Sequence, residues 1–386
     1  MKLSRHICGG LLLLLTAIAC GNTQQATQSS GGITSPSTGV TIAGTGVAVP
    51  GITPSIHPTM LATTTTSVSM TATADMTITP GPGEFENPVI AQDFPDPDTL
   101  KVGTTYYAYA TNGGGKNIQA GKSTDLVHWT MLNDPLPTLP AWSQRGFTWA
   151  PEVSTGADDH HFVMYFVARD TASNKQCIGA ATADTPEGPF TSSNPKPLIC
   201  QLEQGGSIDP ESFTDNDGSR YVVWKNDGNC CGMDTYLYVQ KASRDGLTLE
   251  GTPTKLIHED QGWEGNLVEA PFLWKHGNKY YLFYSANNYA GAAYAVGYAV
   301  ADSLLGPYHK PNDPLLKTTT EHGPVIGPGG EDILTTPDGK NWIVYHSWDP
   351  TISVRQMNID ELDWQGDTPV VKGPYRSPEP VPLPQP

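Results

Sequence analysis

The sequence predicts an all-β protein, a five-bladed β-propeller built around a central channel. Runs rich in aromatic and β-branched residues, which favour half-buried strands, recur every 56 to 62 residues and begin at Tyr106, Phe162, Tyr221, Tyr280 and Trp342. A further candidate strand follows each run, near Ile118, Ile178, Leu237, Val296 and Val354. The sequence contains no long amphipathic helix pattern. Five similar repeats with three or four strands each are typical of propeller blades.

Two other all-β folds also contain many short strands. A β-sandwich gives no reason for so long a regular period, and the repeat of a β-helix is much shorter. The propeller is therefore the preferred fold.

Residues 1–19 have the pattern of a lipoprotein-type signal peptide. A basic start is followed by an apolar run, Leu11 to Leu15, which is too short to cross about 30 Å of hydrocarbon. Cys20 follows the small residue Ala19, as in bacterial lipoproteins, although Ala17 stands where that pattern usually has Leu. We expect Cys20 to be lipidated and to anchor the protein at the bacterial cell surface. The alternative is ordinary cleavage and secretion, which would leave Cys20 as a free thiol or a disulfide partner.

Composition divides the rest of the chain into three parts. Residues 20–83 consist mainly of Thr, Ser, Gly, Pro and Ala, which bury too little apolar surface to fold, so we expect a disordered stalk. Residues 84–373 are rich in aromatic residues and are predicted to form the propeller as one domain. Residues 374–386 form a Pro-rich tail.

The formal net charge of −17 argues against nucleic acid and anionic membranes as partners. It fits a protein that binds a neutral substrate and touches the membrane only through a lipid anchor, and we expect a monomer.

Without Cys8 and Cys20, four cysteines remain, Cys177, Cys200, Cys230 and Cys231. In an exported protein they are expected to form disulfides. Three pairings are possible, and we favour Cys177–Cys200 with Cys230–Cys231. A zinc site is the weaker alternative, because no CxxC pair is present.

Each recurrent strand is preceded, about ten to twelve residues earlier, by a carboxylate beside a Pro or Gly. These carboxylates are Asp96, Glu152, Asp209, Glu269 and Glu331. We expect them to share one position in the innermost strands and so to surround the channel. Crowding and burial would raise some of their pKa values, as a general acid working near neutral pH requires.

The same residues resemble glycoside hydrolase family 43. Phe94-Pro95-Asp96-Pro97-Asp98, Ser207-Ile208-Asp209-Pro210 and Val268-Glu269-Ala270-Pro271 are similar to its three motifs and occur in the family's order. The resemblance implies an enzyme that hydrolyses arabinose- or xylose-containing plant polysaccharide, such as arabinan or arabinoxylan, with inversion at the anomeric carbon, and an active site in the central channel.

The resemblance also implies roles. Asp96 matches the general base, Glu269 the general acid, and Asp209 the carboxylate that raises the pKa of the acid. An inverting glycosidase needs the first two on opposite faces of the sugar. Glu152 and Glu331 match no catalytic position and are expected to be structural.

Trp149, Arg355 and His346 match further family positions, and we assign them to substrate binding. An aromatic ring suits a sugar face and a guanidinium suits hydroxyl groups. Core packing for Trp149 and a surface ion pair for Arg355 are the alternatives.

The family often holds a calcium ion through a His after Gly-Pro-Gly, but here Gly330 follows Gly327-Pro328-Gly329. We therefore expect no required cofactor and regard calcium as doubtful. His322 could approach from another direction, but a His in such a loop is more often simply exposed.

Other functions remain open. A carbohydrate-binding propeller without catalysis would keep aromatic platforms but would not need three catalytic carboxylates. A protein-interaction propeller would need neither the aromatic platforms nor the three carboxylates. A fructan-type five-bladed glycosidase would retain the anomeric configuration, so product stereochemistry would distinguish it.

Overall fold

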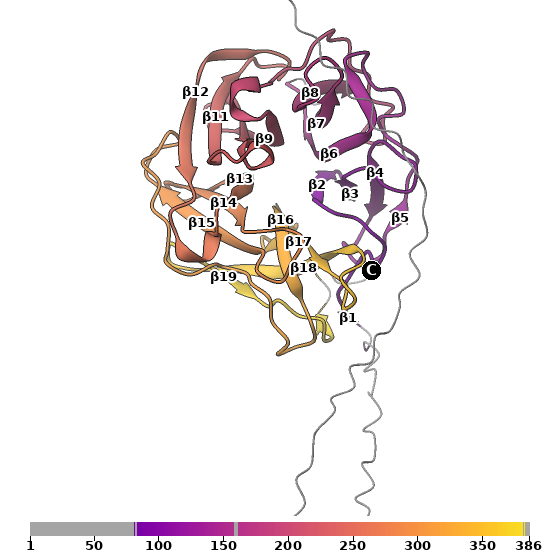
Figure 1. The fold of residues 1–386 in the computed structure, drawn as a ribbon. Helices are drawn as coiled ribbons and strands as arrows, with labels where there is room; N and C mark the ends of the chain where they lie inside the picture. The colour runs from indigo at the N-terminus through magenta and orange to yellow at the C-terminus, as the bar shows by residue number, and fades with distance from the viewer. Residues whose placement is uncertain (1–80, 82, 158–160, 381, 383–386) are drawn as a thin grey trace, which may run out of the picture. The chain divides into compact units, whose positions relative to one another are not determined.

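The computed structural model describes residues 81, 83–157, 161–380 and 382. Five antiparallel sheets follow one another around a ring in these residues, and the innermost strands of the ring are β2, β6, β9, β13 and β16 (Figure 1). The predicted five-bladed propeller is thus confirmed. The signal peptide, Cys20 and nearly all of the predicted stalk lie outside the described residues.

The blades are numbered 1 to 5 in chain order. Blade 1 contains β2 (Asp98–Val102), β3 (Thr105–Ala110), β4 (Gln119–Ser123) and β5 (Thr130–Met131), and blade 2 contains β6 (Ser143–Thr155), β7 (Phe162–Asp170) and β8 (Gln176–Ala183). Blade 3 contains β9 (Ser207–Thr214), β10 (Arg220–Asn226), β11 (Tyr236–Ala242) and β12 (Leu249–His258). Blade 4 contains β13 (Val268–His276), β14 (Lys279–Ala286) and β15 (Ala295–Ala301), and blade 5 contains β16 (Ile326–Thr335), β17 (Asn341–Trp348), β18 (Arg355–Gln365) and β19 (Thr368–Lys372).

Each recurrent aromatic run forms the second strand of its blade, as predicted. These strands are buried on both faces, because successive side chains point to opposite sides of a sheet and each side packs against a neighbouring blade. In β10, Val222 and Trp224 pack with Tyr165 of blade 2, whereas Val223 packs with Leu282 of blade 4. The described part of the chain contains five such core clusters, one at each interface between neighbouring blades. The core is therefore a ring of interfaces that encloses the channel.

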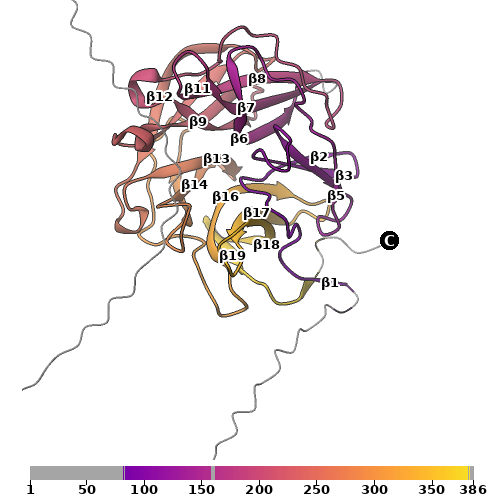
Figure 2. The same cartoon turned by 45° about the vertical axis from the view of Figure 1, so that its right-hand side comes forward.

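The segment before blade 1 joins the ring to blade 5. The strand β1 (Glu84–Phe85) pairs with β20 (Glu379–Pro380), which lies in the predicted Pro-rich tail. The buried Asn87 side chain accepts a hydrogen bond from the Ile359 amide and donates to the carbonyl oxygens of Ile359 and Tyr375. Figures 1 and 2 both place β1 beside blade 5.

The three helices of the described residues are short 3-10 turns, η1 (Leu202–Gln204), η2 (Gly228–Cys231) and η3 (Gly262–Glu264). None of them has the length and apolar character that crossing a membrane requires. Both predicted disulfides, Cys177–Cys200 and Cys230–Cys231, are present.

Candidate active site

One backbone feature recurs at the innermost edge of every blade. A residue with positive φ lies at the equivalent place each time, with φ of 54° at Asp96, 36° at Ala150, 52° at Asp209, 48° at Ala270 and 59° at Gly330. In blades 2 to 5 the strand pairing shifts at this point, as in a β-bulge. Such a conformation is costly for residues other than glycine and is typical of functional sites.

The predicted single position for the five carboxylates is wrong in detail. Relative to the positive-φ residue, Asp96 and Asp209 occupy the same place, Glu269 precedes it by one, Glu331 follows it by one and Glu152 follows it by two. Because of the bulge, side chains at these positions point in different directions. Two separate groups of carboxylates result, one above the other along the channel.

The upper group lines a pocket of about 370 Å³. Asp96, Asp209 and Glu269 all face this pocket, together with Trp149 and Arg355. The structure therefore brings together five of the six predicted active-site residues, one from each of the five blades.

Asp96 is held on three sides. Its Oδ1 accepts a hydrogen bond from Arg355 Nη1 at 3.0 Å, its Oδ2 accepts one from Thr111 Oγ1 at 2.7 Å, and its amide donates to His346 Nδ1 at 3.1 Å. Burial alone would raise the pKa of Asp96, but the Arg355 charge and the Thr111 hydrogen bond bring it below the ordinary value. Asp96 is accordingly ionised near neutral pH, as a general base must be.

Asp209 and Glu269 share one cation, Lys225. The Lys225 ammonium, which is completely buried, lies 2.7 Å from Glu269 Oε2, and Tyr294 donates to Glu269 Oε1 at 2.8 Å. Asp209 Oδ2 accepts a hydrogen bond from the Ala270 amide. Burial first, and then the negative charge of Glu269, raise the pKa of Asp209 to about 7, although Lys225 opposes both. One ammonium for two buried carboxyl groups favours keeping one proton in the pair.

The lower group consists of Asp98, Glu152, Glu211 and Asp332, which we call the lower carboxylate ring. Three of its members, Asp98, Glu211 and Asp332, line a second cavity of about 40 Å³, which adjoins the pocket and shares Asp96 and Asp209 with it. Burial is the first cause that raises the pKa values of all four, to about 6 for Glu152 and for Asp332, and the charges of other ring members add to it for Asp98, Glu152 and Glu211. The ring thus holds protons at a pH where exposed carboxyl groups are ionised.

Glu331 also lines the second cavity, but it is bonded to a serine and not to the lower carboxylate ring. Its Oε2 accepts a hydrogen bond from Ser285 Oγ at 2.6 Å, and the same hydroxyl accepts one from the Gly330 amide. Burial raises the pKa of Glu331 to about 8. These contacts fit the structural role that the sequence predicted for it.

The three predicted substrate-binding residues differ in position. Trp149 lines the pocket and also packs against the core between blades 2 and 3. Arg355 lines it as well, and its guanidinium lies over the ring of Tyr289 at 5.1 Å. His346 does not line it, because its side chain is fully buried behind Asp96. His346 therefore contacts the base and not a substrate in the pocket.

The side chains do not form the metal site that the family often has after Gly-Pro-Gly. A Cβ on Gly330 would lie 2.7 Å from His346 Nδ1, so His346 fills that space. His346 is neutral, since burial lowers its pKa to about 3, and its Nδ1 accepts the Asp96 amide proton, which leaves the hydrogen on Nε2. A nitrogen that carries hydrogen cannot bind a cation. Within the described ranges, no three His, Cys, Asp or Glu side chains are grouped to hold a metal. His322 is exposed and contacts the ring of Tyr375.

Sequence reasoning missed Lys225, Tyr294, Thr111 and Tyr289. Lys225 had a detectable signal, because it is a charged residue that directly follows the apolar run Tyr221–Trp224 in the same predicted strand. A lysine in a strand buried on both faces needs a carboxylate partner. Tyr294 and Tyr289 lie in the segment between β14 and β15, and no pattern marks them.

Two acid–base sites thus face one central pocket. One is an ionised carboxylate and the other is a carboxyl pair that retains a proton, which is the combination that glycosidic bond hydrolysis requires. Fold and site together define a glycoside hydrolase.

The comparison with protein families identifies the family of glycoside hydrolases to which the chain belongs. Residues 85–369 match the model of the glycosyl hydrolases family 43. The chain belongs to this family.

Solved structures of glycoside hydrolases share the fold. A thermostable family-43 glycoside hydrolase is 34% identical and aligns with a TM-score of 0.71, covering 78% of this chain and 99% of its own. An endo-1,4-β-xylanase from Bacteroides thetaiotaomicron is 27% identical and aligns with a TM-score of 0.66, covering 76% of this chain and 99% of its own.

Two curated relatives are glycosidases. The β-D-galactofuranosidase xynD of Aspergillus niger is 27% identical over 67% of this chain and 75% of its own length. Xylosidase/arabinosidase 43B of Humicola insolens is 28% identical over 74% of this chain and 54% of its own length. This chain thus spans three quarters of the first relative and about half of the second.

The lower carboxylate ring should make stability depend on pH. A carboxyl group whose pKa is raised by folding stays protonated while the unfolded chain ionises, so stability falls as pH rises from the unfolded value toward the folded one. Glu152→Gln should therefore raise the free energy of unfolding at pH 8 by about 2 kcal/mol, or the Tm by a few degrees. At pH 3.5 it should have almost no effect.

Thermal unfolding at both pH values measures this difference. Glu203→Gln, a change at an exposed position of η1, is the control and should have little effect at either pH. An equal change at pH 3.5 and pH 8 for Glu152→Gln would contradict the assignment of raised pKa values to the ring.

Proposed function

We propose that this protein is an extracellular enzyme that hydrolyses arabinose- or xylose-containing plant cell-wall polysaccharide with inversion of the anomeric carbon. The observation that carries the proposal is the pocket itself, with Asp96 ionised by Arg355 on one side and Asp209 and Glu269 around Lys225 on another. Relatives named arabinanase, arabinofuranosidase and β-xylosidase support the choice of polysaccharide.

In the proposed reaction, water attacks the anomeric carbon while Asp96 removes its proton. The bond from that carbon to the leaving oxygen breaks as Glu269 gives its proton to the oxygen. Arg355 and Thr111 keep Asp96 ionised and oriented, and His346 fixes its backbone. Lys225 and Tyr294 orient Glu269, and Asp209 helps to keep a proton in the pair. No step of this reaction passes through a metal ion or another cofactor.

Location is proposed as well. The relatives from Thermotoga petrophila and Cellvibrio japonicus are named extracellular, and the Ala19-Cys20 sequence is consistent with a lipid anchor on the outer face of a bacterial cell. We propose that the propeller acts there as a monomer on neutral polysaccharide.

Product analysis tests the proposed function most directly. Purified protein is incubated with debranched arabinan, arabinoxylan, and p-nitrophenyl arabinofuranoside, xyloside and galactofuranoside, the last because of the Aspergillus niger relative. We expect hydrolysis of an arabinose- or xylose-containing substrate, and the first product seen by NMR should have the inverted configuration. Retention of configuration would indicate a fructan-type mechanism, and binding without cleavage would indicate a lectin.

Substitution of the acid should separate substrates by their leaving group. Glu269→Gln is expected to lower activity on polysaccharide by about 10²- to 10⁴-fold. On dinitrophenyl glycosides the loss should be below about tenfold, because such a leaving group departs without a proton. Glu331→Gln, an identical change at a buried carboxyl group outside the pocket, should change both activities by less than about threefold. Equal losses on both substrates would remove Glu269 from the acid role.

Asp209 is expected to act through charge, so its removal should change the pH profile. Asp209→Asn removes one negative charge beside Glu269, and the basic limb of activity should move to lower pH by about one unit. The acidic limb, which reports Asp96, should stay in place. Rates on the same substrate from pH 4 to 10 measure both limbs. A lower rate with both limbs unchanged would show that Asp209 only positions other groups.

A further inference from the structure

The disulfide between Cys230 and Cys231 borders the pocket through Cys230. Both residues belong to η2, which begins two residues after β10 ends, and both are exposed. Cys230 and its neighbour Asn229 are part of the pocket lining. The sulfur pair is thus a surface that a bound substrate can touch.

Fold stabilisation does not explain this disulfide. A disulfide stabilises a protein mainly by restricting the unfolded chain, and the effect grows with the length of the closed loop. Cys177–Cys200 joins residues 23 positions apart, but Cys230 and Cys231 are neighbours and enclose no chain. The pair therefore shapes its own surface instead of connecting distant parts of the fold.

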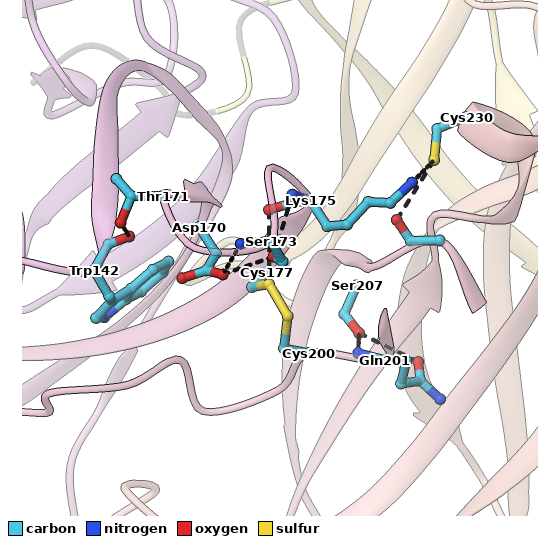
Figure 3. Close-up of a disulfide and its surroundings, with 11 residues drawn as sticks. Trp142, Asp170, Thr171, Ser173, Lys175, Cys177, Cys200, Gln201, Ser207 and Cys230 are labelled. Atoms are coloured by element: carbon cyan, nitrogen blue, oxygen red, sulfur yellow. Dashed lines mark hydrogen bonds between the residues drawn. A yellow bond between two sulfur atoms is a disulfide. The ribbon is translucent and has the colours of Figure 1, made fainter. Parts of the chain in front are cut away.

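Contacts from two other segments hold the pair in place. The Lys175 ammonium, in the turn between β7 and β8, lies 2.7 Å from Cys231 Sγ and 3.7 Å from Cys230 Sγ. Figure 3 shows the Lys175 side chain extending toward Cys230. Cys230 Sγ also lies 3.5 Å from the carbonyl oxygen of Gly205, which follows η1. The sulfur atoms are therefore exposed but fixed, which lowers the entropy lost on binding.

The wall around the sulfur pair combines polar and apolar groups. This wall of the pocket consists of Asp227, Asn229 and Cys230. Trp149 and Tyr289 line other parts of the same pocket. Burial, and then the Glu269 charge, raise the pKa of Asp227 to about 6 against the effect of Lys225. Sugars need this combination, because their hydroxyl groups require hydrogen-bond partners while their C–H faces pack on apolar surfaces.

The position of the wall identifies the sugar unit that it would contact. Lys225, which is bonded to the acid Glu269, is a residue of β10, and Asp227, Asn229 and Cys230 follow directly in the chain. The negative charge of Glu269 raises the pKa of Asp227. The wall therefore lies on the acid side of the pocket, where the leaving group departs, and Arg355 lies with Asp96 on the base side.

We propose that the Cys230–Cys231 disulfide, with Asn229 beside it, binds the sugar unit on the leaving-group side of the scissile bond. The disulfide provides a rigid apolar platform for the C–H face of that sugar, and the Asn229 amide bonds its hydroxyl groups. This inference rests on the proposed function, since it needs a substrate of at least two sugar units.

Calorimetric binding to an inactive protein tests the platform. Asp96→Asn serves as the background, and the double variant Cys230→Ser, Cys231→Ser is compared with it. The probes are α-1,5-arabinotriose and xylotriose, with arabinose and xylose as the monosaccharides. The trisaccharide that the wild type cleaves should bind about 5- to 20-fold more weakly to the double variant, whereas its monosaccharide should bind within about twofold.

Two controls separate the platform from general damage to the loop. Met233→Ser changes an exposed residue of the same segment that does not line the pocket, and it should leave both affinities unchanged. Cys230→Ala with Cys231→Ala keeps an apolar surface, so its loss for the trisaccharide should be smaller than that of the serine pair. Thermal unfolding should show the same Tm for all variants within about 2 °C.

The outcomes are distinct from those of the proposed function. Equal trisaccharide affinity with and without the disulfide overturns the platform alone, provided that the wild type cleaves the probe. Equal weakening for the monosaccharide and the trisaccharide also overturns it, because the loop would then act on the whole site. A wild type that cleaves neither trisaccharide overturns the proposed substrates and the platform together.

Discussion

The site depends on one backbone constraint, the left-handed residue at the innermost edge of each blade. A regular strand would alternate its side chains between the two neighbouring blades and would send none of them upward into the channel. A positive φ at Asp96, Ala150, Asp209, Ala270 and Gly330 interrupts this alternation, and in blades 2 to 5 it coincides with a bulge in the strand pairing. It places the catalytic carboxyl groups above it and the lower carboxylate ring two residues further along. The cost of a positive φ at four residues other than glycine is met by the ring of buried interfaces on either side.

Cations decide which of the many channel carboxyl groups are ionised. Arg355 is bonded to Asp96, Lys225 is bonded to Glu269 and also lowers the pKa of Asp209, and Arg220 is the cation that opposes the raised pKa values of Glu152 and Glu211 in the lower ring. Since burial by itself raises the pKa of a carboxyl group, an ionised base requires a cation of its own, which Arg355 provides for Asp96. The pair around Lys225 has only half of the positive charge that it would need to ionise fully. The same chemical group thus serves as base and as proton reservoir within one pocket.

Repeated strands and short motifs could be predicted from the sequence, whereas contacts between residues from distant segments could not. The period of the aromatic runs identified all five second strands, and the three family motifs identified Asp96, Asp209 and Glu269, because each lies in a stretch of a few residues. The sequence did not show that Glu152 and Glu269 point to different levels of the channel, since a bulge shifts the alternation without changing the spacing. Tyr294 and Thr111 were not predictable, because their partners Glu269 and Asp96 come from other segments of the chain. Lys225 was readable as a buried charge, although its partner was not.

Residues Gly330 and His346 show how this chain can fix its base without the histidine that the family often places after Gly-Pro-Gly. A side chain at position 330 would collide with the His346 ring, so the two positions are linked, and a glycine at the first permits a large ring at the second. The ring stacks with Tyr294 at 5.9 Å and accepts the Asp96 amide proton. Tyr294 in turn donates to Glu269. A single line of contacts therefore runs from the backbone of the base through His346 and Tyr294 to the acid, and it fixes the positions of the two catalytic carboxyl groups relative to each other using only side chains of the propeller.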